Sequence, residues 1–141
     1  MTDYVVYFAL IALSSICYVL YYKQYVFMPK MQKLNLANDF RYARRQNAEL
    51  IDLFCLNSDI LQNTGNVFNG LTFEAALTNL QNLDNNFYTT ATYKQMTGKQ
   101  KTNTGYAATL QADVARQIKI QHELKANFNK LMLNYHRFIA A

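Results

Sequence analysis

The sequence predicts an all-α protein, in which one N-terminal transmembrane helix precedes an antiparallel bundle of three or four long helices. Two observations support this fold class. Residues 4–22 are apolar and carry no charge at neutral pH, and the apolar residues beyond them recur at spacings of three and four. No segment alternates polar and apolar residues as a half-buried strand does. We therefore assign residues 1–29 to the anchor and juxtamembrane segment, and residues 30–141 to the helical domain.

The composition excludes several other classes. One proline, four glycines and no tryptophan argue against a turn-rich β-sandwich, a collagen-like chain and a glycine-rich nucleotide-binding fold. A hydrophobic share of 51% and an aromatic share of 14% argue against disorder. Once the apolar stretch is set aside, roughly 115 residues remain, which is enough for one small core.

The apolar stretch has the length and the flanks of a transmembrane helix. As a helix, residues 4–22 span roughly 28 Å, close to the hydrocarbon thickness of a bilayer. Tyrosines mark both ends, as in the aromatic belts at membrane interfaces. A cleaved signal peptide is the competing interpretation, but Asp3 is the only charged residue before the stretch and bulky tyrosines follow it. We therefore expect an uncleaved anchor.

The basic residues gather beside this stretch. Between residues 23 and 45 only Asp39 is acidic, whereas six residues are basic: Lys23, Lys30, Lys33, Arg41, Arg44 and Arg45. The chain has 14 basic and 9 acidic residues in total, so the remainder carries eight of each. Such a collar favours a membrane surface over nucleic acid as the partner. It predicts an N-terminus outside and a body on the cytoplasmic (or matrix) side.

The first helix of the domain is expected to run from about residue 31 to 63, with Pro29 before it as a hinge or first-turn residue. Its apolar face is defined by spacings of three, four and seven among Phe40, Ala43, Asn47, Leu50, Phe54 and Leu61. Two glycines and several amides in residues 63–70 then predict a turn.

Two further helices are expected. Thr72 is the predicted N-cap of a helix that ends near Gly98, and a loop follows at residues 99–105. The last helix, residues 107–138, keeps a heptad seam along its whole length. In that seam Gln117 and Gln121 form polar layers, or else the stripe shifts to Ile118.

The last helix also resembles that of the LemA family of membrane-anchored bacterial proteins. The matching blocks are Leu110-Gln111-Ala112-Asp113-Val114 and the segment from Phe128-Asn129 through Tyr135 to Ile139. Arg44-Arg45 with the following Leu50-Ile51 is similar to a third family element, although the apolar pair comes about two residues late and the family proline is absent. The resemblance implies an N-terminal span with an antiparallel helical bundle. It implies no reaction and no catalytic residues.

No motif predicts catalysis, a cofactor or a metal. His122 and His136 are the only histidines, and on one helix they lie roughly 21 Å apart, too far to share an ion. Cys17 and Cys55 do not have zinc-ligand spacing, and no Gly-x-Ser-x-Gly nucleophile element is present. We therefore expect a protein that is not an enzyme.

Interaction with other proteins is the function that the sequence favours. Only 16% of the residues are charged, which predicts a charge-poor surface. The candidate contact residues are Tyr88, Tyr93, Tyr106 and Tyr135, although the same tyrosines could simply cover the edge of the core. The expected partners are the bilayer and other membrane or membrane-associated proteins, with no nucleic acid. Alternatives are a protomer of a homo-oligomeric filament or lattice, or an accessory subunit of a membrane energy-converting complex.

Overall fold

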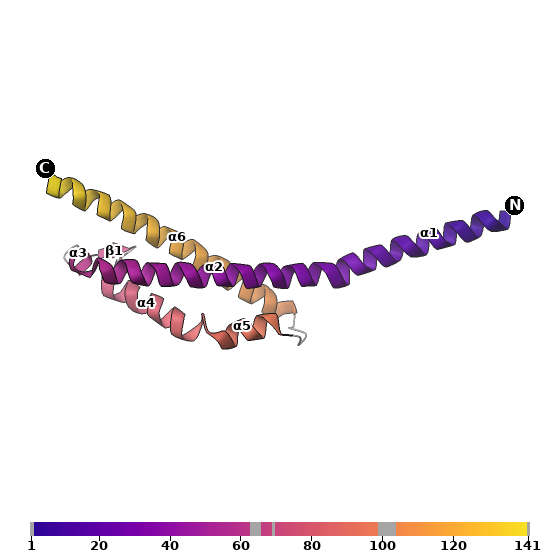
Figure 1. Ribbon diagram of the computed structural model, residues 1–141, viewed down its shortest axis with the longest axis horizontal. Helices are drawn as coiled ribbons and strands as arrows, with labels where there is room; N and C mark the ends of the chain where they lie inside the picture. The colour runs from indigo at the N-terminus through magenta and orange to yellow at the C-terminus, as the bar shows by residue number, and fades with distance from the viewer. Residues whose placement is uncertain (1, 63–65, 69, 99–103, 141) are drawn as a thin grey trace. The chain divides into compact units, whose positions relative to one another are not determined.

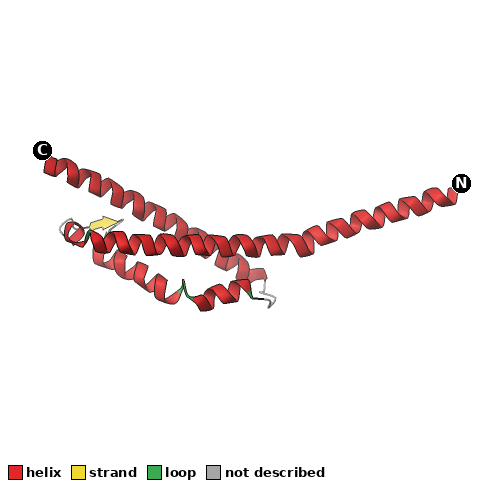
Figure 2. Ribbon diagram, viewed as in Figure 1, coloured by secondary structure: helices red, strands yellow, loops and turns green. Residues whose placement is uncertain are grey.

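The structure is a computed structural model that describes residues 2–62, 66–68, 70–98 and 104–140. These residues are predominantly helical, which confirms the all-α part of the predicted fold class (Figures 1 and 2). The chain divides into two compact units, Met1–Asn35 and Leu36–Ala141. The division lies six residues beyond the predicted boundary at 29/30, because Leu36 is the first buried side chain in the described part of α2.

The first unit contains α1 (Thr2–Tyr22), the π-helical η1 (Lys23–Phe27) and the start of α2 (Met28–Leu56). Every described side chain from Val6 to Tyr25 is exposed. The helical run that begins at Val6 contains an apolar window long enough to cross a membrane, and none of this window is buried. The hydroxyls of Ser14 and Ser15 donate to the Ile11 carbonyl at 2.9 and 2.8 Å, so both are satisfied within the helix.

Pro29 lies in the first turn of α2, which was one of its two expected positions. Proline has no backbone N–H and cannot donate to the carbonyl one turn earlier. The π-helical segment η1 directly precedes this turn. A π-helical turn of this kind changes the hydrogen-bond register, and the sequence pattern did not predict it.

The expected helix over residues 31–63 is interrupted at Asn57, between α2 and α3 (Ser58–Gln62). The Asn57 Nδ2 donates to the Leu53 carbonyl at 2.8 Å. In a continuous helix the backbone N–H of Asn57 would donate to this carbonyl, so the side chain competes with the helix for the same acceptor. The Leu61 N–H donates to the Asn57 carbonyl at 3.1 Å and starts the next turn. Leu61 is fully buried as expected.

A short hairpin follows α3, so the expectation of no strand is wrong at this place. β1 (Asn66–Phe68) pairs antiparallel with β2 (Leu71–Thr72). Gly70 has φ of 82°, a left-handed conformation that glycine adopts without strain. The pairing is too short to show alternation in the sequence. Residues 63–65 and 69 of the predicted turn lie outside the described residues.

The expected helix from Thr72 to about Gly98 is two helices, α4 (Phe73–Asn86) and α5 (Thr90–Thr97). The Thr72 hydroxyl accepts from the Ala75 N–H at 3.3 Å, which confirms the predicted N-cap. The break arises because the N–H groups of Phe87 and Tyr88 both donate to the Leu83 carbonyl at 2.9 Å and close α4. Thr89 then caps α5 by accepting from the Thr92 N–H at 3.2 Å.

The last helix, α6 (Thr104–Ala140), contains the whole predicted segment 107–138. Of the expected loop at 99–105, residues 99–103 lie outside the described residues.

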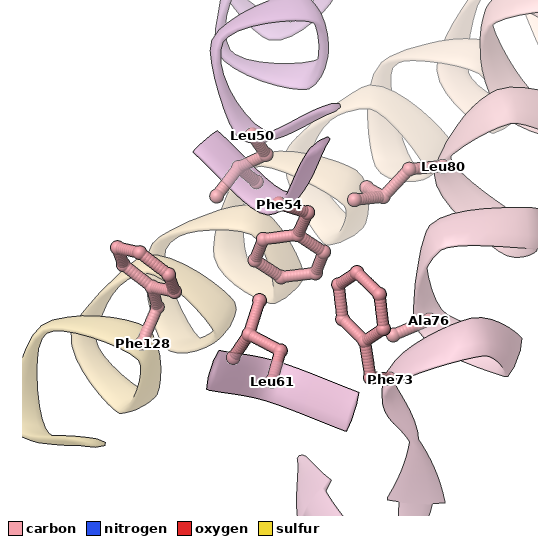
Figure 3. Packing of buried hydrophobic residues seen from close by; sticks show 7 residues of the cluster. All are labelled: Leu50, Phe54, Leu61, Phe73, Ala76, Leu80 and Phe128. Carbon is pink, nitrogen blue, oxygen red and sulfur yellow. The ribbon is translucent and has the colours of Figure 1, made fainter. Parts of the chain in front are cut away.

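The core of the second unit consists of two hydrophobic clusters. The first contains Leu50 and Phe54 of α2, Leu61 of α3, Phe73, Ala76 and Leu80 of α4, and Phe128 of α6 (Figure 3). The second contains Leu36, Phe40, Ala43, Tyr88, Met96, Leu110 and Val114. From the second cluster to the first, the residue numbers rise along α2 and along α6. Over the same step they fall from α5 to α4. Within this unit α4 and α5 therefore run opposite to α2 and α6.

Candidate interaction surfaces

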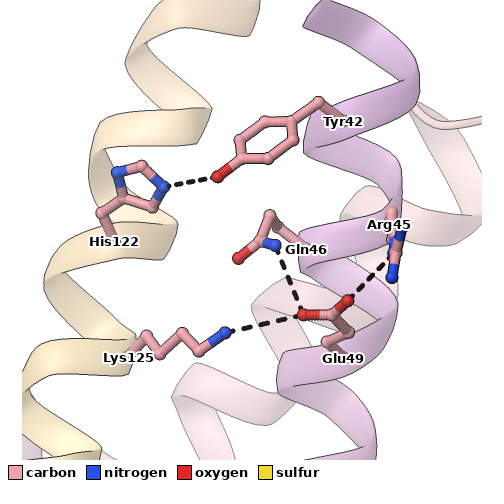
Figure 4. Close-up of polar contacts among 6 residues, drawn as sticks. All are labelled: Tyr42, Arg45, Gln46, Glu49, His122 and Lys125. Atoms are coloured by element: carbon pink, nitrogen blue, oxygen red, sulfur yellow. Dashed lines mark hydrogen bonds and ion pairs between the residues drawn. The ribbon is translucent and has the colours of Figure 1, made fainter.

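At the surface of the second unit, α2 and α6 are joined by polar side chains outside the hydrophobic clusters. The Tyr42 Oη lies 3.0 Å from the His122 Nε2, and the two rings meet edge to face (Figure 4). Both side chains are exposed. The pair joins the two helices at the surface through one hydrogen bond, and its surroundings are open to water.

Glu49 connects the same two helices and lies seven residues, about two turns, beyond Tyr42 on α2. Its carboxylate accepts from the Arg45 Nε at 3.1 Å and from the Gln46 Nε2 at 3.3 Å, and it lies 3.5 Å from the Lys125 Nζ (Figure 4). The Arg45 side chain is 81% exposed. Exposed ion pairs of this kind each stabilise a fold by less than about 1 kcal/mol. These contacts therefore add little to the free energy of unfolding, and they join partly exposed residues of α2 and α6.

The other flank of α2 carries an aromatic contact with α5. The Arg41 guanidinium donates to the Tyr93 hydroxyl and lies 5.0 Å from the centre of the Tyr93 ring. The Phe40 ring lies beside it, with centroids 6.1 Å apart from Tyr93. The contact between Arg41 and Tyr93 combines a hydrogen bond with a cation–π interaction.

The six predicted membrane-surface residues are divided between the two units. Lys23 and Lys30 are exposed and Lys33 is half-buried in the first unit. Arg41, Arg44 and Arg45 are exposed in the second unit, where two of them contact Tyr93 and Glu49 as described above. Their role at a membrane surface stays a prediction.

The four candidate contact tyrosines have different environments. Tyr88 is 1% exposed and belongs to the core, so in this fold it is not available to a partner protein. Tyr93 and Tyr135 are half-buried. Tyr106 is 46% exposed, and its hydroxyl donates to the Gln95 Oε1 at 3.3 Å. The alternative interpretation as core therefore applies to Tyr88, whereas partner contact stays a prediction for the other three.

Three buried residues, Asn47, Tyr88 and Gln121, make polar contacts inside the second unit. The Gln121 Nε2 donates to the Tyr88 hydroxyl at 3.1 Å, and the Asn47 Nδ2 donates to the Leu80 carbonyl at 2.9 Å. The sequence pattern named Gln121 as a candidate polar layer, and the structure buries it, while Gln117 and Ile118 are half-buried. The partnership with Tyr88 was missed, because its two residues are 33 positions apart.

Burial also alters the acidity of Tyr88. Desolvation raises its pKa to about 12; the hydrogen bond from Gln121 acts in the opposite direction, and the Asp84 carboxylate adds a smaller rise. A tyrosine in the unfolded chain has a pKa near 10. The stability that neutral Tyr88 contributes is therefore complete below about pH 10 and is lost as the pH rises from about 10 to 12.

The Tyr88→Phe variant is expected to lose about 1–2 kcal/mol of unfolding free energy at neutral pH, because the buried Gln121 Nε2 then has no acceptor. Between about pH 10 and 12, the variant is expected to lose less stability than the wild type. Urea unfolding followed by circular dichroism at several pH values measures both effects. The exposed Tyr106 supplies the control: if Tyr106→Phe changes the pH dependence as much as Tyr88→Phe does, the assignment to Tyr88 is wrong.

The end of α6 carries three large exposed apolar side chains. Phe138 is 85% exposed, Ile139 63% and Leu133 62%. The predicted heptad seam is thus packed at Phe128 but not at Phe138. After Glu123 the chain has no acidic residue, whereas Lys125, Lys130 and Arg137 are basic. This apolar and basic end, residues 130–140, is the candidate contact surface for another protein.

No metal centre emerges in the part of the chain that the structure describes, where no three His, Cys, Asp or Glu side chains come together to hold an ion. Comparison with family models, curated proteins and solved structures found no match to this chain. The resemblance to the LemA family therefore depends on the quoted residues alone and stays a prediction.

Proposed function

We propose that this chain is a single-pass membrane protein whose helical body, an antiparallel bundle, acts as a non-catalytic interaction or scaffolding module at the inner face of a membrane. The observation that supports it most is the apolar window of α1, of which no part is buried. Exposed apolar helices of this length are costly in water and stable in lipid. The tyrosines near both ends and the basic residues that follow agree with this location.

The interaction role is supported by the end of α6. Single exposed apolar side chains are normal on a protein surface, whereas a group of them beside basic residues is typical of a contact surface. Phe138 and Ile139 are exposed directly after Arg137, and Leu133 is exposed three residues after Lys130. We infer that a partner with an apolar surface and acidic flanks binds here. A LemA-like architecture, with one span and a helical bundle, would serve the same role.

An experiment on this surface tests the proposal. Purified in mild detergent from its native membranes, the wild-type chain is expected to retain another protein in a fixed ratio. Phe138→Glu is expected to reduce the retained amount at least tenfold, because it places a charge in the apolar contact. The matched control is Gln111→Glu, which introduces the same charge at an exposed position of the same helix, far from residues 130–140.

The outcomes also separate the alternatives. A chain that co-purifies only with further copies of itself in a repeating assembly would favour the filament or lattice protomer. A fixed place among many subunits of an energy-converting complex would favour the accessory-subunit alternative. Equal losses in Phe138→Glu and Gln111→Glu would contradict the apolar contact.

A further inference from the structure

A pocket of about 140 Å³ lies between α4 and α6. Its walls are largely aliphatic, with Leu80 and Leu83 on α4 and Ile120 and Leu124 on α6. The polar side chains of Asn79 and Glu123, both exposed, also line it. Apolar cavities of about 150 Å³ in other proteins hold a molecule the size of benzene, so this pocket has room for one small ring or short chain.

Gln121, one of the lining residues, has a buried side-chain oxygen without a hydrogen-bond partner among the described residues. The residue lines the pocket and is 1% exposed. Its Nε2 donates to the Tyr88 hydroxyl, while its Oε1 accepts no hydrogen bond from any described residue. A buried carbonyl oxygen without a donor destabilises the folded protein, so such an atom is expected to find a donor elsewhere.

We propose that this pocket binds a small uncharged molecule that combines an apolar ring or short chain with one hydroxyl or N–H group, which donates to the Gln121 Oε1. The aliphatic walls disfavour a charged ligand, because burial removes its hydration and the one charged lining residue, Glu123, is exposed to water, which screens its charge. Glu123 at the lining disfavours anions further. The proposal concerns the second unit alone and is independent of whether the chain spans a membrane.

Phenol and toluene are the probes, because they share a ring size and differ in the donor. The full chain, labelled at leucine and isoleucine methyl groups and held in lipid nanodiscs, is titrated with each and followed by NMR at measured free concentrations. We expect phenol to shift the methyl signals of Leu80, Leu83, Ile120 and Leu124, but not those of Leu36 and Leu110 in the second cluster. We expect phenol to bind about tenfold more tightly than toluene.

Two variants test the assignment. Gln121→Leu removes the acceptor and is expected to abolish the preference for phenol, while Gln111→Leu, an exposed position on the same helix, leaves it unchanged. Should Gln121→Leu fail to fold, Ile120→Trp provides the second test. Ile120 is 42% exposed, so a larger side chain there closes the pocket from its surface and is expected to remove the phenol shifts.

Three results would overturn the proposal. The first is that neither probe shifts the pocket methyl groups, as expected if water alone occupies the pocket. The second is that toluene binds the wild type as tightly as phenol. The third is that phenol shifts the pocket signals equally in the wild type and in Ile120→Trp.

Discussion

Replacement of Phe54 by alanine is expected to lower the free energy of unfolding by about 3–5 kcal/mol, because it leaves a cavity where three helices meet. Phe54 is 0% exposed, and its ring lies 5.6 Å from that of Phe73 and 5.8 Å from that of Phe128. Figure 3 shows it among side chains of α2, α4 and α6. Urea unfolding of the full chain in detergent, followed by circular dichroism, measures the loss.

The matched control is Leu56→Ala, two residues further on the same helix. Leu56 is 83% exposed, so its truncation is expected to change the free energy of unfolding by less than about 0.5 kcal/mol. If Phe54→Ala costs no more than Leu56→Ala, the first hydrophobic cluster does not hold these helices together.

The double substitution Leu10→Arg with Leu13→Arg is expected to abolish membrane insertion. Both leucines lie within the apolar stretch, at 60% and 63% exposure. Each arginine at the centre of a transmembrane helix costs about 2.5–3.5 kcal/mol on insertion scales, so two of them offset much of the gain from the remaining apolar residues. Fractionation of cell membranes after alkaline extraction measures the result.

The control places a charge in the flank instead. Gln24→Arg adds a basic residue beside Lys23, outside the apolar stretch, and is expected to remain in the membrane fraction.

For the wild type, a C-terminal tag is expected to be protected from protease in vesicles whose outer face is the cell exterior. Digestion of the tag would contradict the predicted orientation. Recovery of the double variant in extracted membranes would contradict the proposed anchor.

Much of the helical content could be predicted because it depends on neighbours in the sequence. Apolar residues at spacings of three and four fall on one face of a helix whatever that face later contacts. This is why the segment 107–138 lies within α6 and why Phe40, Leu50 and Phe54 are buried as expected. The Thr72 cap was readable for the same reason, since it bonds to a residue three positions away.

The interruptions could not be read in this way. The stripe through Leu83, Phe87 and Ala91 continues smoothly in the sequence, yet the helix stops at 87–89, where Tyr88 enters the core, and Ala91 is exposed. Asn57 is one amide among many, and its bond to the Leu53 carbonyl marks the second break. In both places a side-chain or tertiary contact competes with continuation of the helix.

The candidate sites depended even more on distant partners. The unpaired Gln121 Oε1 and the pocket between α4 and α6 exist only because segments more than 30 residues apart are packed together. Likewise, the heptad seam is continuous to Phe138, but nothing in its period indicates that Phe138 is left 85% exposed.

The sequence by itself determined the helical class, the apolar first helix and the face that each longer helix turns inward, because these properties follow from composition and from spacing along one chain. Only the tertiary structure decided where the helices break, which tyrosine is buried and where a polar atom lacks a partner. These features depend on which residues of other helices arrive at the same place, and the period of a single helix carries no information about that.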